Sequence, residues 1–145
     1  MNNDSCYSSA GSPSMHKRIQ VLVADPRGII REGLRYLLES EHGIAVVALA
    51  DDAHGLAEKA RLCSPNVIVM DERLLEDLAA LGPLPPVVAL CDTPPSAPRR
   101  GVTFVDKSLL FERLIPVVRE QVRAVPQPLL SGRRFPTDPV RNARL

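Results

Sequence analysis

The chain has 145 residues, of which 45% are hydrophobic, so it can bury one sizeable core and leaves little room for a second. Its formal net charge of +1 gives no overall basic field that would indicate nucleic acid or an anionic membrane as a partner. The polar N-terminus lacks the apolar stretch of a signal peptide, and no apolar run is long enough to cross a bilayer. Three cysteines at wide, irregular spacing fit neither a disulfide framework nor a paired metal site, so we expect a cytoplasmic protein.

The two ends of the chain have the composition of tails. Residues 1–16 are rich in Ser, Asn, Gly and Pro, and cannot bury enough apolar surface to offset the entropy lost on ordering. They predict a disordered N-terminal tail. Residues 125–145 are rich in Pro and Arg and have little helical periodicity, which predicts a linker or a C-terminal arm. One domain is therefore expected over residues 17–124.

Between the tails, short apolar runs alternate with helical patterns, which is typical of β-α-β units with a parallel sheet. The runs are nearly continuous in Val, Ile, Leu and Ala, as in strands that helices cover on both faces. Five strands are predicted, over residues 19–24, 44–50, 66–70, 87–90 and 102–105. The expected fold class is α/β, with a doubly wound five-stranded parallel sheet.

The first helix has the clearest pattern. It begins near Gly28, and its apolar residues recur at the spacing of one helical face, namely Ile30, Leu34, Leu37 and Leu38. A second, weaker helix is expected over residues 53–62. Pro65 then favours an extended conformation for Ser64, at the entry to the third strand.

The last helix is expected to begin at Ser108, whose hydroxyl can cap it, and to run to about residue 122. Pro116 lies inside this helix and predicts a kink, because proline removes a backbone hydrogen bond. The segment 92–101, between the fourth and fifth strands, holds three prolines. The fourth helix of such a fold is therefore predicted to be short or missing.

Charged residues follow the carboxyl ends of the first, third, fourth and fifth predicted strands. In a doubly wound sheet, function gathers where the carboxyl ends of the strands meet. Oxygen ligands and one lysine at that edge could bind a divalent cation and activate a carboxylate as a nucleophile. The residues that the sequence places there are Asp25, Asp71 with Glu72, Cys91 with Asp92, and Asp106 with Lys107.

Three segments carry a resemblance, VLVADPRGIIREGLRYLL, SPNVIVMDERL and VDKS. Together they resemble a response-regulator receiver domain over about residues 18–122, and the first is most similar to receivers joined to LuxR-type helix-turn-helix domains. The resemblance implies that Asp71 is the phosphoacceptor and that Lys107 contacts the phosphoryl group. It also implies that Asp25 and Asp71 hold Mg²⁺, whereas a sensor kinase as partner stays open.

Two positions depart from the family pattern and one fits it. Pro26 stands where the family has a second acidic residue, which predicts weakened Mg²⁺ binding and poorer phosphoryl transfer. Cys91 stands at the Ser or Thr position, and a thiol is a weak hydrogen-bond donor. Phe104, at the aromatic switch position, is ordinary. Two plainer interpretations stay open: Lys107 in a structural ion pair, and Cys91 as a small buried hydrophobic residue.

The resemblance leads to an atypical receiver, not itself an enzyme, that acts as a dimerising regulatory module of a transcriptional regulator. Its switching is expected to be impaired or independent of phosphorylation. The first and last helices offer the dimer surface, and DNA would be bound only through a domain that this chain does not contain. Two alternatives are a receiver still phosphorylated at Asp71 with Mg²⁺, and a ligand-sensing stand-alone receiver whose ligand occupies the space of the shortened fourth helix.

Overall fold

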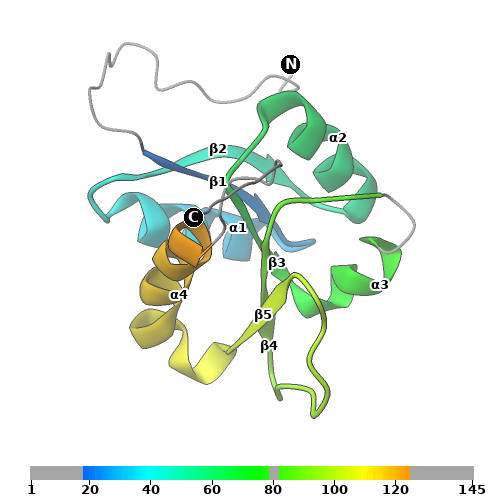
Figure 1. The fold of residues 1–145 in the computed structure, drawn as a ribbon. Helices are drawn as coiled ribbons and strands as arrows, with labels where there is room; N and C mark the ends of the chain where they lie inside the picture. The colour runs from blue at the N-terminus through cyan, green and yellow to red at the C-terminus, as the bar shows by residue number, and fades with distance from the viewer. Residues whose placement is uncertain (1–17, 79–81, 125–145) are drawn as a thin grey trace, which may run out of the picture.

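The computed structural model describes residues 18–78 and 82–124 of the chain. They contain a five-stranded sheet in which neighbouring strands are parallel, in the order β2-β1-β3-β4-β5 (Figure 1). The strands are β1 (Ile19–Ala24), β2 (Ile44–Ala50), β3 (Val67–Asp71), β4 (Val87–Cys91) and β5 (Val102–Asp106). The predicted doubly wound α/β fold is confirmed. The last three strands are displaced or extended by one residue at their carboxyl ends from the predicted ranges.

Helices cover both faces of this sheet. The α-helices are α1 (Gly28–Glu39), α2 (Ala53–Cys63), α3 (Leu75–Leu78) and α4 (Leu110–Ala124), and short 3₁₀ turns precede two of them, η1 (Glu72–Leu74) and η3 (Lys107–Leu109). In Figure 1, α1 and α4 lie on one side of the sheet, and α2 and α3 lie on the other. Residues 92–101, all of which the structure describes, form no helix. The prediction that the helix between the fourth and fifth strands is short or missing is therefore confirmed, and the label α4 belongs to the last helix of the domain.

Two apolar clusters hold the layers together. On one face, Leu34 and Leu38 of α1 and Leu114, Val117 and Val118 of α4 pack against alternate residues of the strands. On the other face, residues of α2 and α3 pack against the remaining strand residues, which include Leu22, Ile68 and Met70. The central strands β1 and β3 are buried on both faces, which explains their continuous apolar sequences.

Two predictions about local conformation are wrong. Ser64 ends α2 in the left-handed region, with φ of 48°, and its N–H donates to the carbonyl of Ala60. A C-terminal helix cap outweighs the preference that Pro65 imposes on its predecessor. Ser108 does not cap the last helix, because the turn η3 begins one residue earlier and the carboxylate of Asp106 accepts from the Ser108 N–H. The helix α4 continues through Pro116, and the kink there stays a prediction.

The predicted tails, residues 1–16 and 125–145, lie outside the described residues. Within the part of the chain that the structure describes, none of the helices has the length and apolar character needed to span a membrane. The carboxyl ends of β1, β3, β4 and β5 meet at one edge of the sheet, as the parallel topology requires. That edge carries the charged residues that the sequence predicted to lie together.

Candidate functional site

Two buried aspartates form the centre of the site. Asp25 follows β1 and Asp71 ends β3, and these neighbouring strands pair Ala24 with Met70 directly before them. Asp25 is 1% exposed and Asp71 is fully buried. Buried carboxylates need charged or hydrogen-bonded partners, since removing them from water is otherwise costly. The partners found here define what the site can do.

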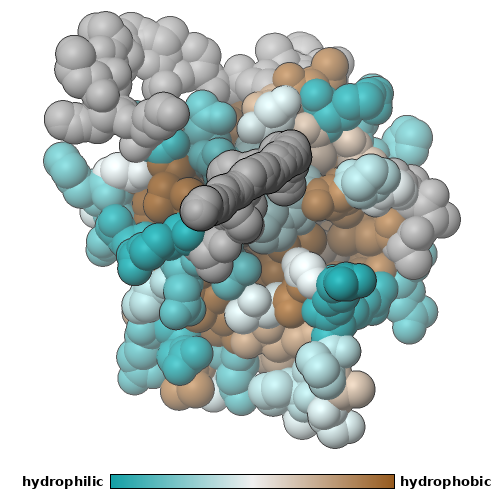
Figure 2. Space-filling model, viewed as in Figure 1, coloured by the Kyte–Doolittle hydropathy of each residue, from teal (hydrophilic) through white to brown (hydrophobic). Residues whose placement is uncertain are grey.

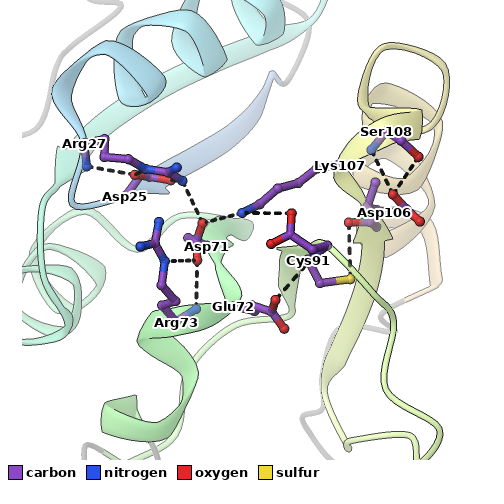
Figure 3. A network of polar contacts seen from close by, with 11 residues as sticks. Asp25, Arg27, Asp71, Glu72, Arg73, Cys91, Asp106, Lys107 and Ser108 are labelled. Carbon is purple, nitrogen blue, oxygen red and sulfur yellow. Dashed lines mark hydrogen bonds and ion pairs between the residues drawn. The ribbon is translucent and has the colours of Figure 1, made fainter.

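The guanidinium of Arg27 connects the two aspartates (Figure 3). Its Nε lies 3.0 Å from Oδ1 of Asp25, and its Nη2 lies 3.0 Å from Oδ2 of the same carboxylate. The same Nη2 also lies 2.9 Å from Oδ2 of Asp71. Planar two-point pairing of this kind is the strong form of an arginine–carboxylate contact. One side chain therefore neutralises charge on both buried acids.

Asp71 is further held by Arg73 and Lys107. Its Oδ1 accepts from the backbone N–H of Arg73 at 2.9 Å and from the Arg73 Nε at 3.1 Å. Its Oδ2 lies 3.0 Å from the Nζ of Lys107. Burial alone would raise the pKa of Asp71, but the hydrogen bonds from Arg73 and Lys107 outweigh it and hold this pKa below its usual value. The carboxylate is thus ionised, and both of its oxygens are occupied.

Hydrogen bonds to Asp25 hold the loop between β1 and α1 in place. The backbone N–H of Arg27 donates to Oδ1 of Asp25 at 2.8 Å, and Nη1 of Arg31 donates to the Asp25 carbonyl oxygen at 2.8 Å. The hydrogen bond to Asp25 raises the pKa of Arg27 above its ordinary value, against the opposing effect of desolvation. Arg27 is therefore a permanent cation at a fixed position.

The rim of the site is acidic and open to solvent. Asp92 is exposed, and its Oδ1 lies 3.9 Å from the Nζ of Lys107, a loose ion pair. The backbone N–H of Asp92 donates to the carboxylate of Glu72 at 3.4 Å. Asp106 turns to its own loop and accepts from the N–H and hydroxyl of Ser108 at 2.8 and 2.7 Å. These hydrogen bonds hold the pKa of Asp106 below its usual value.

No protein-family model matches the chain. It is similar to a protein-glutamate methylesterase/protein-glutamine glutaminase of Anaeromyxobacter dehalogenans, with 31% identity over 86 residues that make up 54% of this chain and 24% of that protein. It is also similar to the transcriptional regulatory protein YxjL of Bacillus subtilis, with 33% identity over 57 residues, 39% of this chain and 26% of that protein. The aligned part is thus about a quarter of each relative.

Solved structures supply the deciding comparison. The response regulator domain of CheB from Thermotoga maritima matches with a TM-score of 0.60 at 21% identity, over 76% of this chain and all of that chain. A LuxR-family two-component response regulator from Aurantimonas matches with a TM-score of 0.61 at 21% identity, over 74% of this chain and 86% of that chain. The chain has the fold of a response-regulator receiver domain. The resemblance expected from the sequence is confirmed at the level of the fold.

The structure brings together three of the residues that the sequence assigned to the receiver pocket, Asp25, Asp71 and Lys107. It places Cys91 differently, because the Cys91 thiol lies 3.6 Å from the backbone carbonyl of Val105 in β5. Cys91 is fully buried, and desolvation, together with the carboxylates of Glu72, Asp106 and Asp92, raises the pKa of this thiol. These surroundings are those of a small buried hydrophobic residue.

Two further residues of the receiver complete the comparison with the sequence. Phe104 is half-buried in β5 and packs against the apolar cluster on the α2 and α3 face. Cys63, at the end of α2, is disulfide-bonded, although the irregular spacing of the cysteines predicted no disulfide framework. Spacing along the chain cannot reveal a pairing that depends on how distant segments pack.

The oxygen atoms of the receiver pocket do not form a site for Mg²⁺. Pro26 has no carboxylate, and Arg27 engages both oxygens of Asp25 and one of Asp71. Within residues 18–78 and 82–124, no group of three or more His, Cys, Asp or Glu side chains could hold a metal ion. Mg²⁺ prefers several oxygen ligands in octahedral geometry. The donor set present here therefore does not fit the metal that the resemblance implies.

Arg27 and Arg73 are the pocket residues that sequence reasoning missed. Each is a cation two positions after an aspartate at the end of a strand, in the segments Asp25-Pro26-Arg27 and Asp71-Glu72-Arg73. In both, the backbone N–H and the side-chain Nε reach back to the same carboxylate oxygen. This repeated spacing is the signal that could have identified them.

Proposed function

We propose that this chain is the receiver part of an atypical response regulator, in which conventional switching by phosphorylation is impaired. The observation that carries the proposal is the ion pair between Nη2 of Arg27 and Oδ2 of Asp71, at 2.9 Å. A phosphoacceptor needs a free carboxylate oxygen as the nucleophile and a cation that neutralises the incoming phosphoryl group. Here both oxygens of Asp71 are engaged by cationic side chains of the protein itself.

The part of the fold that would respond to phosphorylation is also altered. Cys91 offers a buried thiol that contacts Val105, where a receiver of the conventional kind would offer a hydroxyl. Residues 92–100 are exposed coil, so no helix is available there to move against Phe104. Both features support a domain that transmits its signal without this movement.

We also propose that the domain is a homodimeric module of a cytoplasmic transcriptional regulator and has no enzymatic activity of its own. The similarity to YxjL and to the LuxR-family structure supports a regulator, with DNA bound by another domain. The dimer surface consists of three exposed apolar side chains on the two helices that share one sheet face, Ile29 and Tyr36 of α1 and Phe111 of α4. Apolar side chains of this size on a regulatory domain favour a protein partner.

Intact mass spectrometry with acetyl phosphate and MgCl₂ tests the impaired switch. The expected result is no phosphorylated species in the folded wild-type protein. A conventional receiver run in parallel shows that the reagent is active, and Asp71→Asn serves as the matched control. A phosphorylated species that disappears in Asp71→Asn would contradict the proposal and support the first alternative, a receiver still phosphorylated at Asp71.

A second candidate function is ligand sensing, and a groove beside the missing helix favours it. The groove has a volume of about 450 Å³, within the range of small-molecule sites, and lies between α3 and the starts of β4 and β5. Figure 2 shows apolar surface over α3 and the segment leading into β4. The groove is lined by Leu75, Leu78, Leu84, Pro85, Pro86, Val87, Arg99, Arg100, Gly101, Val102 and Gln121.

The lining of this groove selects one class of ligand. It combines leucines and prolines with two arginines, and none of the described residues that line it is acidic. A carboxylic acid with an aliphatic body would match both parts, since the arginines can pair with its carboxylate. Medium-chain fatty acids should therefore raise the melting temperature of the wild type, and Arg99→Glu should remove the effect. An equal shift in Arg99→Glu would exclude the groove as the binding site.

A further inference from the structure

We propose that Arg27 is a built-in counter-cation that takes the place of the divalent metal ion in the pocket of this receiver. The proposal rests on the position of the guanidinium between Asp25 and Asp71, at 3.0 and 2.9 Å from their Oδ2 atoms. In a receiver, that space between the two strand-end carboxylates is where a cation is needed, because two buried like charges otherwise repel each other. In this protein the cation is a side chain of the chain itself, the guanidinium of Arg27.

The local sequence fixes Arg27 in this position. Proline at residue 26 restricts the backbone just before it, and the Arg27 N–H donates to the same Asp25 oxygen that receives its Nε. Arg31, one turn further along α1, donates to the Asp25 carbonyl oxygen. The loop is thereby organised around the arginine.

The charges of the pocket oppose a second cation. Two buried carboxylates, Asp25 and Asp71, face three cationic groups, those of Arg27, Arg73 and Lys107. A dication brought among them would find both oxygens of each aspartate already paired with these cationic side chains. Binding the metal would therefore require the loss of contacts that now stabilise the two buried carboxylates. Arg27 therefore excludes the metal as well as replacing it.

An ordinary surface ion pair does not account for this arrangement. The Arg27 side chain is 43% exposed, and pairs between exposed groups contribute little to stability. Its two partners, however, are buried, so removal of Arg27 leaves one carboxylate without its main ion-pair partner and weakens the pairing of the other. The arginine thus connects the carboxyl ends of β1 and β3 through the two aspartates.

Cation binding tests the proposal directly. Mn²⁺, used as a paramagnetic substitute for Mg²⁺, is titrated into the full chain and followed by electron paramagnetic resonance. We expect no specific binding to the wild type, and binding to Arg27→Ala that is roughly tenfold tighter or more than this background, because both oxygens of Asp25 lose the guanidinium that occupies them. Arg73→Ala is the matched control. It also removes one positive charge beside Asp71, but it leaves Arg27 on both aspartates, so its binding should stay close to that of the wild type.

Thermal unfolding supplies a second measurement. Without metal, Arg27→Ala should melt below the wild type, and MgCl₂ should raise its melting temperature by linkage while leaving the wild type unchanged. Adding Asp25→Asn to Arg27→Ala should abolish this rescue. If the alanine variant does not fold, Arg27→Gln keeps a hydrogen-bond donor while removing the charge. Specific Mn²⁺ binding to the wild type, or none to the folded Arg27 variants, would overturn the proposal.

The inference rests on the proposed receiver role of this pocket, but its test is separate. Phosphorylation of the wild type at Asp71 without any bound divalent cation would contradict the proposed function and leave the role of Arg27 standing. Mn²⁺ binding by the wild type together with a lack of phosphorylation would contradict the role of Arg27 and leave the proposed function standing. The two experiments therefore distinguish the failure of one idea from the failure of the other.

Discussion

Arg27 and Asp71 are 44 positions apart in the chain, and their Nη2 and Oδ2 atoms lie 2.9 Å apart at the centre of the receiver pocket. The contact joins the loop after β1 to the end of β3, and it sets the charge of the whole site. Asp71 in this protein is a stabilised anion among cations, which is an arrangement opposite to that of an acidic pocket waiting for a metal ion. The behaviour of the isolated domain should reflect this difference.

Replacement of Asp71 by Asn should lower the free energy of unfolding at pH 7. The pKa of Asp71 is depressed in the folded state, so its contribution is present above the unfolded pKa of about 4 and is lost as pH falls through the folded pKa. Urea unfolding at pH 7 and near pH 3 should show a gap between wild type and variant that narrows in acid. Asp92→Asn, on an exposed side chain, should change little. A more stable Asp71→Asn protein would mean that carboxylate repulsion dominates the pocket.

A charge placed on the proposed dimer surface should produce monomers. Tyr36 is 80% exposed on α1, and in a two-fold dimer each substitution acts twice. Sedimentation equilibrium of Tyr36→Glu should show a monomer at concentrations where the wild type is dimeric. The control is His54→Glu, because His54 is exposed and lies on α2, which covers the opposite face of the sheet. A wild type that stays monomeric at every concentration would exclude this interface.

The Cys91 thiol should be unreactive until the domain unfolds. It is fully buried, and its pKa is raised by desolvation and by the nearby carboxylates, so little thiolate forms near neutral pH. Alkylation by iodoacetamide, located by peptide mass mapping, should be roughly a thousandfold slower than in urea-denatured protein, as expected when labelling needs opening of the fold. Rapid labelling of the native protein would indicate an accessible thiol with a separate role.

Truncation of Leu114 should test the packing of α4. This side chain is fully buried between α4 and the sheet, so Leu114→Ala should lower the free energy of unfolding by about 2–5 kcal/mol. Leu62→Ala, on an exposed part of α2, should change it by no more than about 0.5 kcal/mol. Urea denaturation monitored by circular dichroism measures both. If Leu114→Ala and Leu62→Ala lowered the free energy of unfolding by similar amounts, the packing of Leu114 between α4 and the sheet would not contribute to stability as expected.

The fold could be predicted from sequence because its signals are local and repeated. Continuous apolar runs marked the five strands, the spacing of Leu34 and Leu38 marked the buried face of α1, and clustered prolines marked the missing helix. The errors at Ser64 and Ser108 arose where a backbone cap competed with a side-chain preference. Such competition is decided by one or two hydrogen bonds, which sequence patterns do not resolve.

The candidate site was predicted in part. Asp25, Asp71 and Lys107 could be placed together because each ends or follows a parallel strand. The role of Arg27 could not, because its guanidinium reaches Asp71 only through the register between β1 and β3 and a particular side-chain conformation. The sequence showed that Pro26 removes a carboxylate from the pocket, but it did not show that Arg27 supplies a guanidinium there.

The absence of a helix between β4 and β5 sets the order in which the sheet can open. β5 lies at the edge of the sheet and is mostly half-buried, whereas β1 and β3 lie inside it, β3 wholly buried and β1 buried except at its start. Local opening begins where the fewest apolar contacts are lost, so backbone amides of β5 should exchange with solvent before those of β3. The outer edge can thus loosen and reclose while the bridge between β1 and β3 through Arg27 stays intact.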